Sequence, residues 1–109
     1  KVILVDDMID TAGTICNAAK ALKEKGAIEV YACATHGIFS GPAVERLKNS
    51  PLNKVVVTDS IEIPEDKKFD KLRILTTSKM FAETIERIYW NEAISDLFEM
   101  PIEERENNV

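Results

Sequence analysis

Cysteine and histidine are scarce in this sequence, which limits its metal chemistry and its covalent cross-links. The 109 residues include only two cysteines, Cys16 and Cys33, and a single histidine. The cysteines lack the spacing of metal ligands and stand among apolar residues, so we expect buried free thiols in a reducing compartment. A chain of this length buries a modest core without a metal or a disulfide.

Long apolar runs and a positive net charge are also absent. No apolar run approaches the roughly 18 residues of a membrane span, and the formal net charge is −5. We therefore expect neither a membrane nor a nucleic-acid partner, and local backbone groups would have to hold an anionic substrate. The sequence opens directly on a strand pattern, without a signal peptide or an initiator Met. We expect a cytoplasmic location and a chain that is a piece of something longer.

Short apolar runs alternate with helical patterns along the chain. The runs predict strands, and they cover residues 2–5, 30–35, 54–59 and 72–78. Apolar residues at helical spacing predict helices between Thr14 and Gly26, over 41–49, and after Ser78, the expected cap. The charged segment 61–70 is expected to be a solvated loop. The alternation predicts an α/β fold in which a parallel sheet has helices on both faces.

The opening stretch, VILVDDMIDTAGT, combines an apolar strand with two adjacent carboxylates and a loop of small residues. Ligands of parallel sheets bind beyond the carboxyl ends of the strands, where we expect Asp6 and Asp7. The DTAGT loop (residues 10–14) would then turn into a helix and aim several backbone N–H groups at one point. This pattern predicts a phosphate cradle, and it lacks the lysine of the GxxxxGK[ST] type.

The side chains of this stretch suit a sugar phosphate. Thr11 and Thr14 add hydroxyl donors, whereas Ala12 and Gly13 allow a ligand close to the backbone. Asp6 and Asp7 can accept hydrogen bonds from a diol or hold a hydrated Mg²⁺. A phosphate beside vicinal hydroxyls describes a ribose 5-phosphate. The alternative for this stretch is a plain strand end with two solvated Asp residues and Asp10 as a helix N-cap.

Four stretches carry a resemblance to a known family. VILVDDMIDTAGT resembles the 5-phosphoribosyl 1-pyrophosphate (PRPP) motif shared by type I phosphoribosyltransferases and PRPP synthases. ATHGIFSGPAVERL (34–47), VVVTDSI (55–61) and NEAISDLF (91–98) resemble ribose-phosphate pyrophosphokinase, the PRPP synthase. The resemblance implies a phosphoribosyltransferase-like domain over residues 1–98, matching the carboxyl-terminal portion of a two-domain enzyme, with a polar tail over 99–109.

The resemblance also implies a reaction and its participants. ATP would donate its β,γ-diphosphoryl group to the anomeric hydroxyl of ribose 5-phosphate, with Mg²⁺, giving PRPP and AMP. The family implies a homo-oligomer, with the catalytic residues expected outside this chain. By resemblance, Asp6 and Asp7 would bind ribose hydroxyls. The residues that would surround the 5-phosphate are Asp10, Thr11, Ala12, Gly13 and Thr14.

Asp10 is puzzling beside a phosphate on charge alone. We infer that its carboxylate organises the loop by accepting backbone N–H bonds, or meets the ligand while protonated or through water. His36 has no partners at metal spacing, and we interpret it as structural. Ser40 and Gly41, in a second small-residue turn, form a candidate regulatory anion site. Ser95 is a further regulatory candidate by resemblance, although Ala93 stands where the family has another serine.

Two other interpretations remain open. A type I phosphoribosyltransferase would share the DTAGT loop, but THGIFSGPA is foreign to that class, and no Lys or Arg follows Asp10 to serve further phosphates. A catalytically silent, synthase-like regulatory subunit would lose residues of this loop, which is intact here. The residues upstream of Lys1 would separate these classes. The roles of Tyr89 and Trp90, interface patch or core cover, are not decided by the sequence.

Overall fold

The computed structural model describes residues 1–98, which fall into two compact units, one ending at Leu75 and the other beginning at Thr76. The elements of the first unit are β1 (Val2–Ile9), α1 (Gly13–Glu24), β2 (Val30–Gly37), α2 (Ala43–Asn49), β3 (Lys54–Thr58), the 3-10 turn η1 (Glu65–Lys67) and β4 (Leu72–Leu75). The second contains α3 (Ser78–Tyr89) and the 3-10 turn η2 (Ser95–Phe98). The predicted domain bounds stay a prediction, and the polar tail over 99–109 lies outside the described residues.

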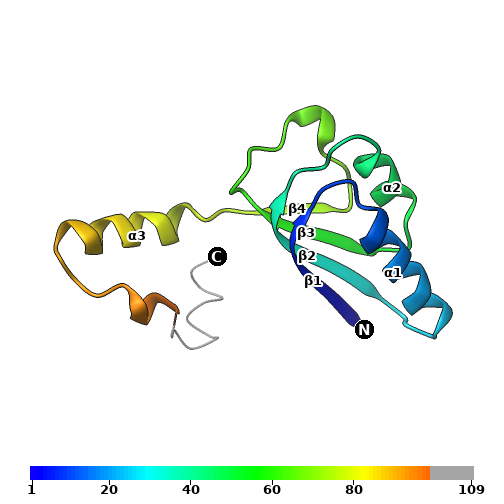
Figure 1. The fold of residues 1–109 in the computed structure, drawn as a ribbon, viewed down its shortest axis with the longest axis horizontal. Helices are drawn as coiled ribbons and strands as arrows, with labels where there is room; N and C mark the ends of the chain where they lie inside the picture. The colour runs from blue at the N-terminus through cyan, green and yellow to red at the C-terminus, as the bar shows by residue number, and fades with distance from the viewer. Residues whose placement is uncertain (99–109) are drawn as a thin grey trace. The chain divides into compact units, whose positions relative to one another are not determined.

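Four parallel strands form the sheet, in the order β1-β2-β3-β4 (Figure 1). The register pairs Val5 with Cys33, Ala34 with Val57, and Val57 with Ile74. Parallel strands need crossover connections, and helices α1 and α2 supply the first two. The predicted parallel α/β architecture is confirmed. All four strands were predicted from their apolar runs.

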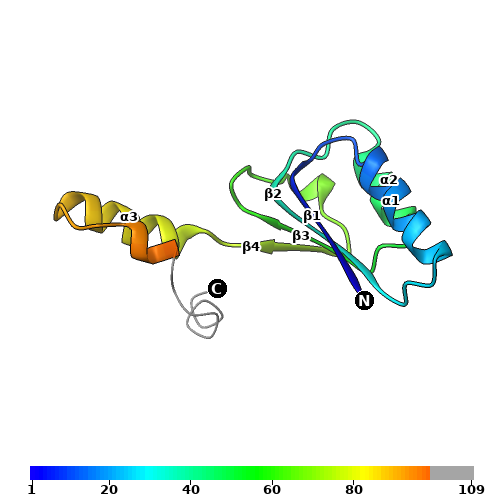
Figure 2. The same ribbon diagram turned by 60° about the horizontal axis from the view of Figure 1, so that its bottom comes forward.

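Helices α1 and α2 lie on the same face of this sheet (Figure 2). Each successive strand is added on the same side of the previous one, and crossovers between parallel strands are nearly always right-handed. Two such crossovers in one direction place both helices on one face. The other face of β1 is open within the first unit, where Ile3 is 61% and Val5 is 79% exposed. Helices therefore cover one face of residues 1–75, where the alternation predicted both.

The core lies between this helix pair and the sheet. Its fully buried large side chains are Phe39, Leu47, Leu52, Val30, Val55 and Val57. Burying such a side chain stabilises the fold by about 1.5–3 kcal/mol. Cys16 and Ala19 bring α1 close to the strands. Both cysteines are free thiols, as predicted; Cys16 is buried, which raises the pKa of its thiol, and Cys33 is half-buried.

Several element boundaries differ from the sequence prediction. Strand β1 continues to Ile9, so Asp6 and Asp7 lie inside the strand and not beyond its end. Their carboxylates accept the N–H groups of the residues that follow, Asp7 and Met8, each at 2.8 Å. Strand β4 ends at Leu75. Thr77 is the N-cap of α3, and Ser78 is the first helical residue instead of the cap.

Helix α3 has an apolar stripe at the predicted helical spacing. Phe81, Ile85 and Ile88 are all more than half exposed within the described residues. Tyr89 and Trp90 pack edge to face, with ring centroids 5.0 Å apart, and both are exposed. Among residues 1–98 no helix has the length and apolar character to cross a membrane.

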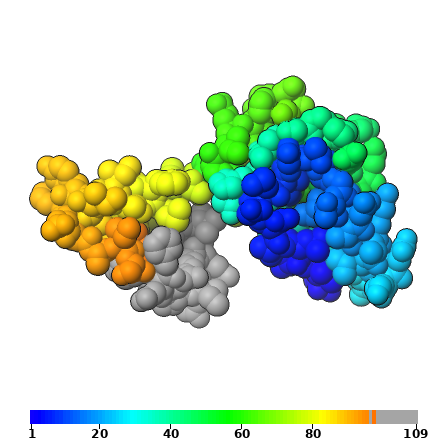
Figure 3. Space-filling view, in the orientation of Figure 1, coloured from blue at the N-terminus to red at the C-terminus, as the bar shows by residue number. Residues whose placement is uncertain are grey.

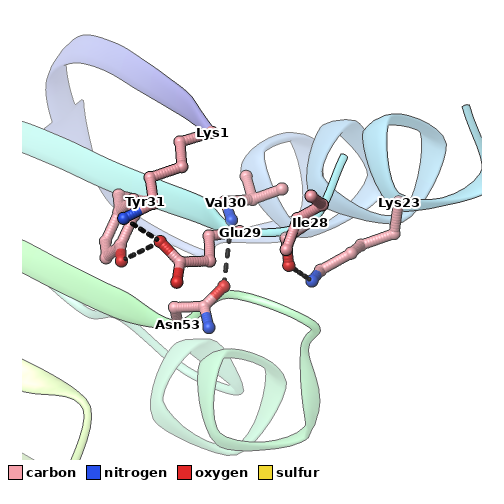
Figure 4. Close-up of polar contacts among 7 residues, drawn as sticks. All are labelled: Lys1, Lys23, Ile28, Glu29, Val30, Tyr31 and Asn53. Carbon is pink, nitrogen blue, oxygen red and sulfur yellow. Dashed lines mark hydrogen bonds and ion pairs between the residues drawn. The ribbon is translucent and has the colours of Figure 1, made fainter. Parts of the chain in front are cut away.

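A small polar cluster ties the start of β1 to β2 (Figure 4). The Tyr31 hydroxyl donates to the Glu29 carboxylate at 2.7 Å, and the Lys1 ammonium lies 3.1 Å from the same oxygen. Nearby, the backbone N–H of Val30 donates to the side-chain oxygen of Asn53 at 2.9 Å. These contacts fix the end of the sheet opposite the DTAGT loop.

We expect Glu29→Gln to lower the melting temperature at neutral pH and to lose this effect in acid. The hydrogen bonds from Tyr31 and Lys1 lower the pKa of Glu29 below its ordinary value of 4.5. A carboxyl whose pKa is lowered on folding stabilises the protein above its unfolded pKa, and this contribution disappears as the pH falls through the folded pKa. Melts of both proteins at neutral pH and at about pH 3 measure it, with Glu62→Gln in an exposed loop as control. An equal difference at both pH values would contradict the assignment.

Candidate functional site

The DTAGT loop turns directly from β1 into α1. Ala12 is the N-cap and takes a left-handed conformation, with a φ of 65°, and the helix begins at Gly13. The N–H of Cys16 donates to the carbonyl of Ala12 and closes the first helical turn at 3.1 Å. The preceding N–H groups, those of Gly13, Thr14 and Ile15, therefore have no acceptor within the helix. They lie at its positive end, which attracts anions.

A hollow of about 160 Å³ lies over this helix start. Asp6 and residues 8–15 line it. The structure thus brings Asp6 together with all five residues of the DTAGT loop, as the sequence predicted for a single site. Asp7 is not among the lining residues, and as the neighbour of Asp6 in a strand it points to the opposite face of the sheet. Asp6 is therefore the carboxylate that shares the hollow with the loop.

The carboxylates fit a magnesium ion only in part. Mg²⁺ is commonly held by one or two carboxylates together with waters and substrate phosphates. Asp6 and Asp10 both line the hollow and offer two such carboxylates. Within residues 1–98 no group of three or more His, Cys, Asp or Glu side chains has a metal-binding arrangement. A metal ion at this site would therefore depend on water and on the ligand for most of its coordination.

The segment between β2 and α2, residues 38–42, forms hydrogen bonds to the end of β1 and to the DTAGT loop. The N–H groups of Ile38 and Phe39 donate to the carbonyl of Ile9 at 3.0 and 3.2 Å. The N–H of Ser40 donates to the carbonyl of Asp10 at 3.0 Å. These bonds fix the end of β1 and the start of the loop through backbone carbonyls, and the organising role of the Asp10 carboxylate stays a prediction. In Figure 3 the blue atoms of the loop lie against the blue-green atoms of this segment.

Phe39 anchors the segment between β2 and α2 in the core. Its φ of 54° is in the left-handed region, which bulky residues rarely adopt, and its side chain is only 1% exposed. The ring packs edge to face on Phe69, with centroids 6.0 Å apart. A Cβ atom at Gly37 would come within 3.0 Å of the Phe39 ring. The THGIFSGPA stretch thus packs against the core and supports the neighbouring loop.

The predicted regulatory residues lie in different parts of the chain. The N–H of Ser40 is bonded to the DTAGT loop, whereas Gly41 is exposed with a φ of 56°. Ser95 begins η2 in the second unit. A regulatory role for these three residues stays a prediction. His36 is half-buried and lies 2.7 Å from the Ser60 hydroxyl, which in turn donates to the carbonyl of Thr35. This network supports the structural interpretation of His36.

Arg46, which sequence reasoning missed, contacts the loop from α2. Its guanidinium Nη1 donates to the carbonyl of Thr11 at 3.1 Å. A Cβ atom at Gly13 would lie 3.2 Å from the same nitrogen. This cation comes from a helix more than thirty positions after the opening stretch. The sequence did offer one indication of this contact. The loops after the first two predicted strands follow neighbouring parallel strands, so they meet at one edge of the sheet.

A protein-family model matches the part of the chain that contains the site residues described above. Residues 1–99 match the model described as "Phosphoribosyl synthetase-associated domain". The chain belongs to this family. The matched region includes the DTAGT loop, its supporting segment and Arg46, so every residue that lines the hollow falls within the phosphoribosyl synthetase-associated domain.

The curated relatives carry a consistent name. The chain is 57% identical over 98 residues to a ribose-phosphate pyrophosphokinase of Caldanaerobacter subterraneus, covering 90% of this chain and 31% of the relative. It is 57% identical over 99 residues to that of Clostridium acetobutylicum, covering 91% and 31%. The crystal structure of phosphoribosylpyrophosphate synthetase from Mycobacterium smegmatis matches with a TM-score of 0.81 at 44% identity, over 84% of this chain and 31% of that one. The chain thus spans about a third of the length of these relatives.

Proposed function

We propose that this chain forms the ribose 5-phosphate site of a ribose-phosphate pyrophosphokinase and corresponds to its carboxyl-terminal portion. The observation that carries the proposal is the hollow over the start of α1. There, Asp6 lies beside a loop with free helix N–H groups and two threonine hydroxyls. The names and the identity of the relatives support the same reaction class.

The two ends of ribose 5-phosphate suit the two sides of the hollow. The phosphate dianion would accept hydrogen bonds from the N–H groups of residues 13–15 and from the hydroxyls of Thr11 and Thr14, at the positive end of the α1 dipole. The ribose hydroxyls would donate to the Asp6 carboxylate, a charge-assisted bond. Asp7 would take part only through water or a ligand that extends to the other face.

The proposed chemistry is the transfer of a diphosphoryl group. The C1 hydroxyl oxygen of ribose 5-phosphate attacks the β-phosphorus of ATP in line, the bond from that phosphorus to the α-phosphate oxygen breaks, AMP leaves, and the hydroxyl proton is lost to solvent. Such reactions depend mainly on positioning and on charge stabilisation. In the proposal this chain positions the acceptor, and the ATP site and the catalytic cations lie outside it. Mg²⁺, when bound, would neutralise the phosphates of ATP.

The remaining features of the enzyme are extensions of this proposal. A homo-oligomeric assembly and a cytoplasmic location follow from the proposed family activity. A phosphoribosyltransferase is the weaker alternative, because the relatives carry the synthase name at more than 50% identity. A silent regulatory subunit is the other alternative, and the complete DTAGT loop favours a chain from an active enzyme.

The test uses a chimeric enzyme, in which the matching segment of the Caldanaerobacter relative is exchanged for that of this chain. We expect Asp6→Asn in this enzyme to cost about 1.5–3 kcal/mol of ribose 5-phosphate or transition-state binding, because a charge-assisted acceptor is lost. Steady-state kinetics with varied ribose 5-phosphate measure it. Asp7→Asn should cost less, since Asp7 does not line the hollow, and Asp66→Asn in η1 should cost nothing. A wild-type kcat/KM in the Asp6→Asn enzyme would remove Asp6 from the site.

A further inference from the structure

Three successive backbone carbonyls, those of Ile9, Asp10 and Thr11, accept hydrogen bonds from residues between β2 and the middle of α2. Backbone N–H groups bond the carbonyls of Ile9 and Asp10, and the Arg46 guanidinium bonds that of Thr11. Of the hydrogen bonds to these three carbonyls, only the one to Thr11 comes from a side chain. It is therefore the contact that a substitution can remove without altering the backbone of the supporting segment.

The orientation of the Thr11 carbonyl decides where the next N–H group points. A trans peptide is planar, and its C=O and N–H groups point in opposite directions. Because Arg46 holds the carbonyl of Thr11 on the α2 side, the N–H of Ala12 in the same peptide is directed away from α2. Ala12 lines the hollow and has the left-handed φ of 65° that this turn requires. A rotation of this peptide would present a carbonyl oxygen to an anion instead of an N–H group.

We propose that Arg46 is a positioning residue, which holds the Thr11–Ala12 peptide so that the DTAGT loop is ready to bind an anionic phosphate ester. This rests on the proposed function, since the ligand is the 5-phosphate of ribose 5-phosphate. The guanidinium also lies against Gly13 at the first helical residue, and its positive charge stands beside the loop that receives the anion. Arg46 thus acts on the ligand through the loop.

Arg46 is exposed, so its role in folding is separable from its role in binding. Substitutions of exposed helix residues away from caps and buried contacts usually change stability by less than about 0.5 kcal/mol. Lys20 lines the same groove between α1 and α2 as Arg46, a cavity of about 380 Å³. Replacement of Lys20 therefore removes a positive charge from the same groove without removing the bond to Thr11. It is the matched control.

The experiment measures KM and kcat for both substrates in the chimeric enzyme and its Arg46→Met, Arg46→Lys and Lys20→Met variants. We expect Arg46→Met to raise the KM for ribose 5-phosphate about 10-fold, as the loss of one hydrogen bond implies, with an unchanged KM for ATP. Arg46→Lys should recover part of the affinity, because it keeps the charge and a donor. Lys20→Met should match the wild type. A purely structural role would lower the amount of active enzyme and leave the KM unchanged.

An unchanged KM for ribose 5-phosphate in Arg46→Met, or an equal rise in Lys20→Met, would overturn the positioning role. If Arg46→Met does not fold, the KM of Arg46→Lys decides: a raised value supports the role and a wild-type value overturns it. The Gly13→Val variant separates this proposal from the function. If Gly13→Val loses ribose 5-phosphate binding while Arg46→Met keeps the wild-type KM, the assignment of the site stands and only the positioning role of Arg46 is rejected. Unchanged ribose 5-phosphate binding in both variants would reject the assignment of the site and, with it, the positioning role of Arg46.

Discussion

Gly13→Val in the chimeric enzyme is expected to abolish ribose 5-phosphate binding while the protein remains folded. A Cβ atom at this position would already lie 3.2 Å from Nη1 of Arg46. A β-branched side chain adds two further carbons at the first helical residue, which lines the hollow where the phosphate would approach. The site is only half-buried and begins a helix, where Val costs less than about 1 kcal/mol of stability.

Titration calorimetry with ribose 5-phosphate measures this effect, and Gly13→Ala provides a graded control. Ala adds only the Cβ atom, which the flexible Arg46 side chain can accommodate by a small shift. We expect Gly13→Ala to bind more weakly than the wild type and Gly13→Val to show no binding. Unchanged affinity in Gly13→Val, with a normal melting temperature, would contradict the assignment of the DTAGT loop to the phosphate.

The 109-residue chain alone is expected to have no synthase activity, although it retains the proposed acceptor site. Transfer of a diphosphoryl group needs cations around the triphosphate and the transition state. Among the described residues, Arg46 is the cation whose guanidinium contacts the DTAGT loop, and it is bonded to the Thr11 carbonyl. Lys1 stands at the other end of β1, where it pairs with Glu29. One guanidinium on a loop carbonyl does not provide a site for a triphosphate.

An assay with ATP, Mg²⁺ and ribose 5-phosphate tests this division of labour. The purified chain should give no AMP or PRPP above background, whereas the chimeric enzyme, assayed in parallel, should turn over. Robust turnover by the chain itself would show that the donor site lies within these residues.

The strands and the main loop were predictable because their determinants are local. A short run of Val, Ile and Leu before a small-residue turn predicts a strand leading into a helix, as at β1 and α1. The predicted grouping of Asp6 with the DTAGT loop required only that loop and strand be consecutive in the chain. Asp7 could not be separated from Asp6 in this way. That distinction depends on strand β1 continuing past both residues to Ile9.

The contacts that hold the loop were not predictable, because they join segments far apart in the sequence. The bond from Arg46 to Thr11 spans 35 positions and depends on the register of β1 with β2 and on the length of the turn before α2. The covering of one sheet face by both helices also depends on strand order, which alternation alone does not give. The left-handed Phe39 could not be expected either, because its unfavourable φ is stabilised by burial against Phe69.

The most direct measurement is a crystal structure of the chimeric enzyme with ribose 5-phosphate. We expect the phosphate to lie within hydrogen-bond distance of the N–H groups of Gly13, Thr14 and Ile15. We also expect a ribose hydroxyl to donate to the Asp6 carboxylate and the Arg46 bond to the Thr11 carbonyl to remain in place. A phosphate bound elsewhere, with the hollow over α1 empty at saturating ligand, would contradict the assignment of the site.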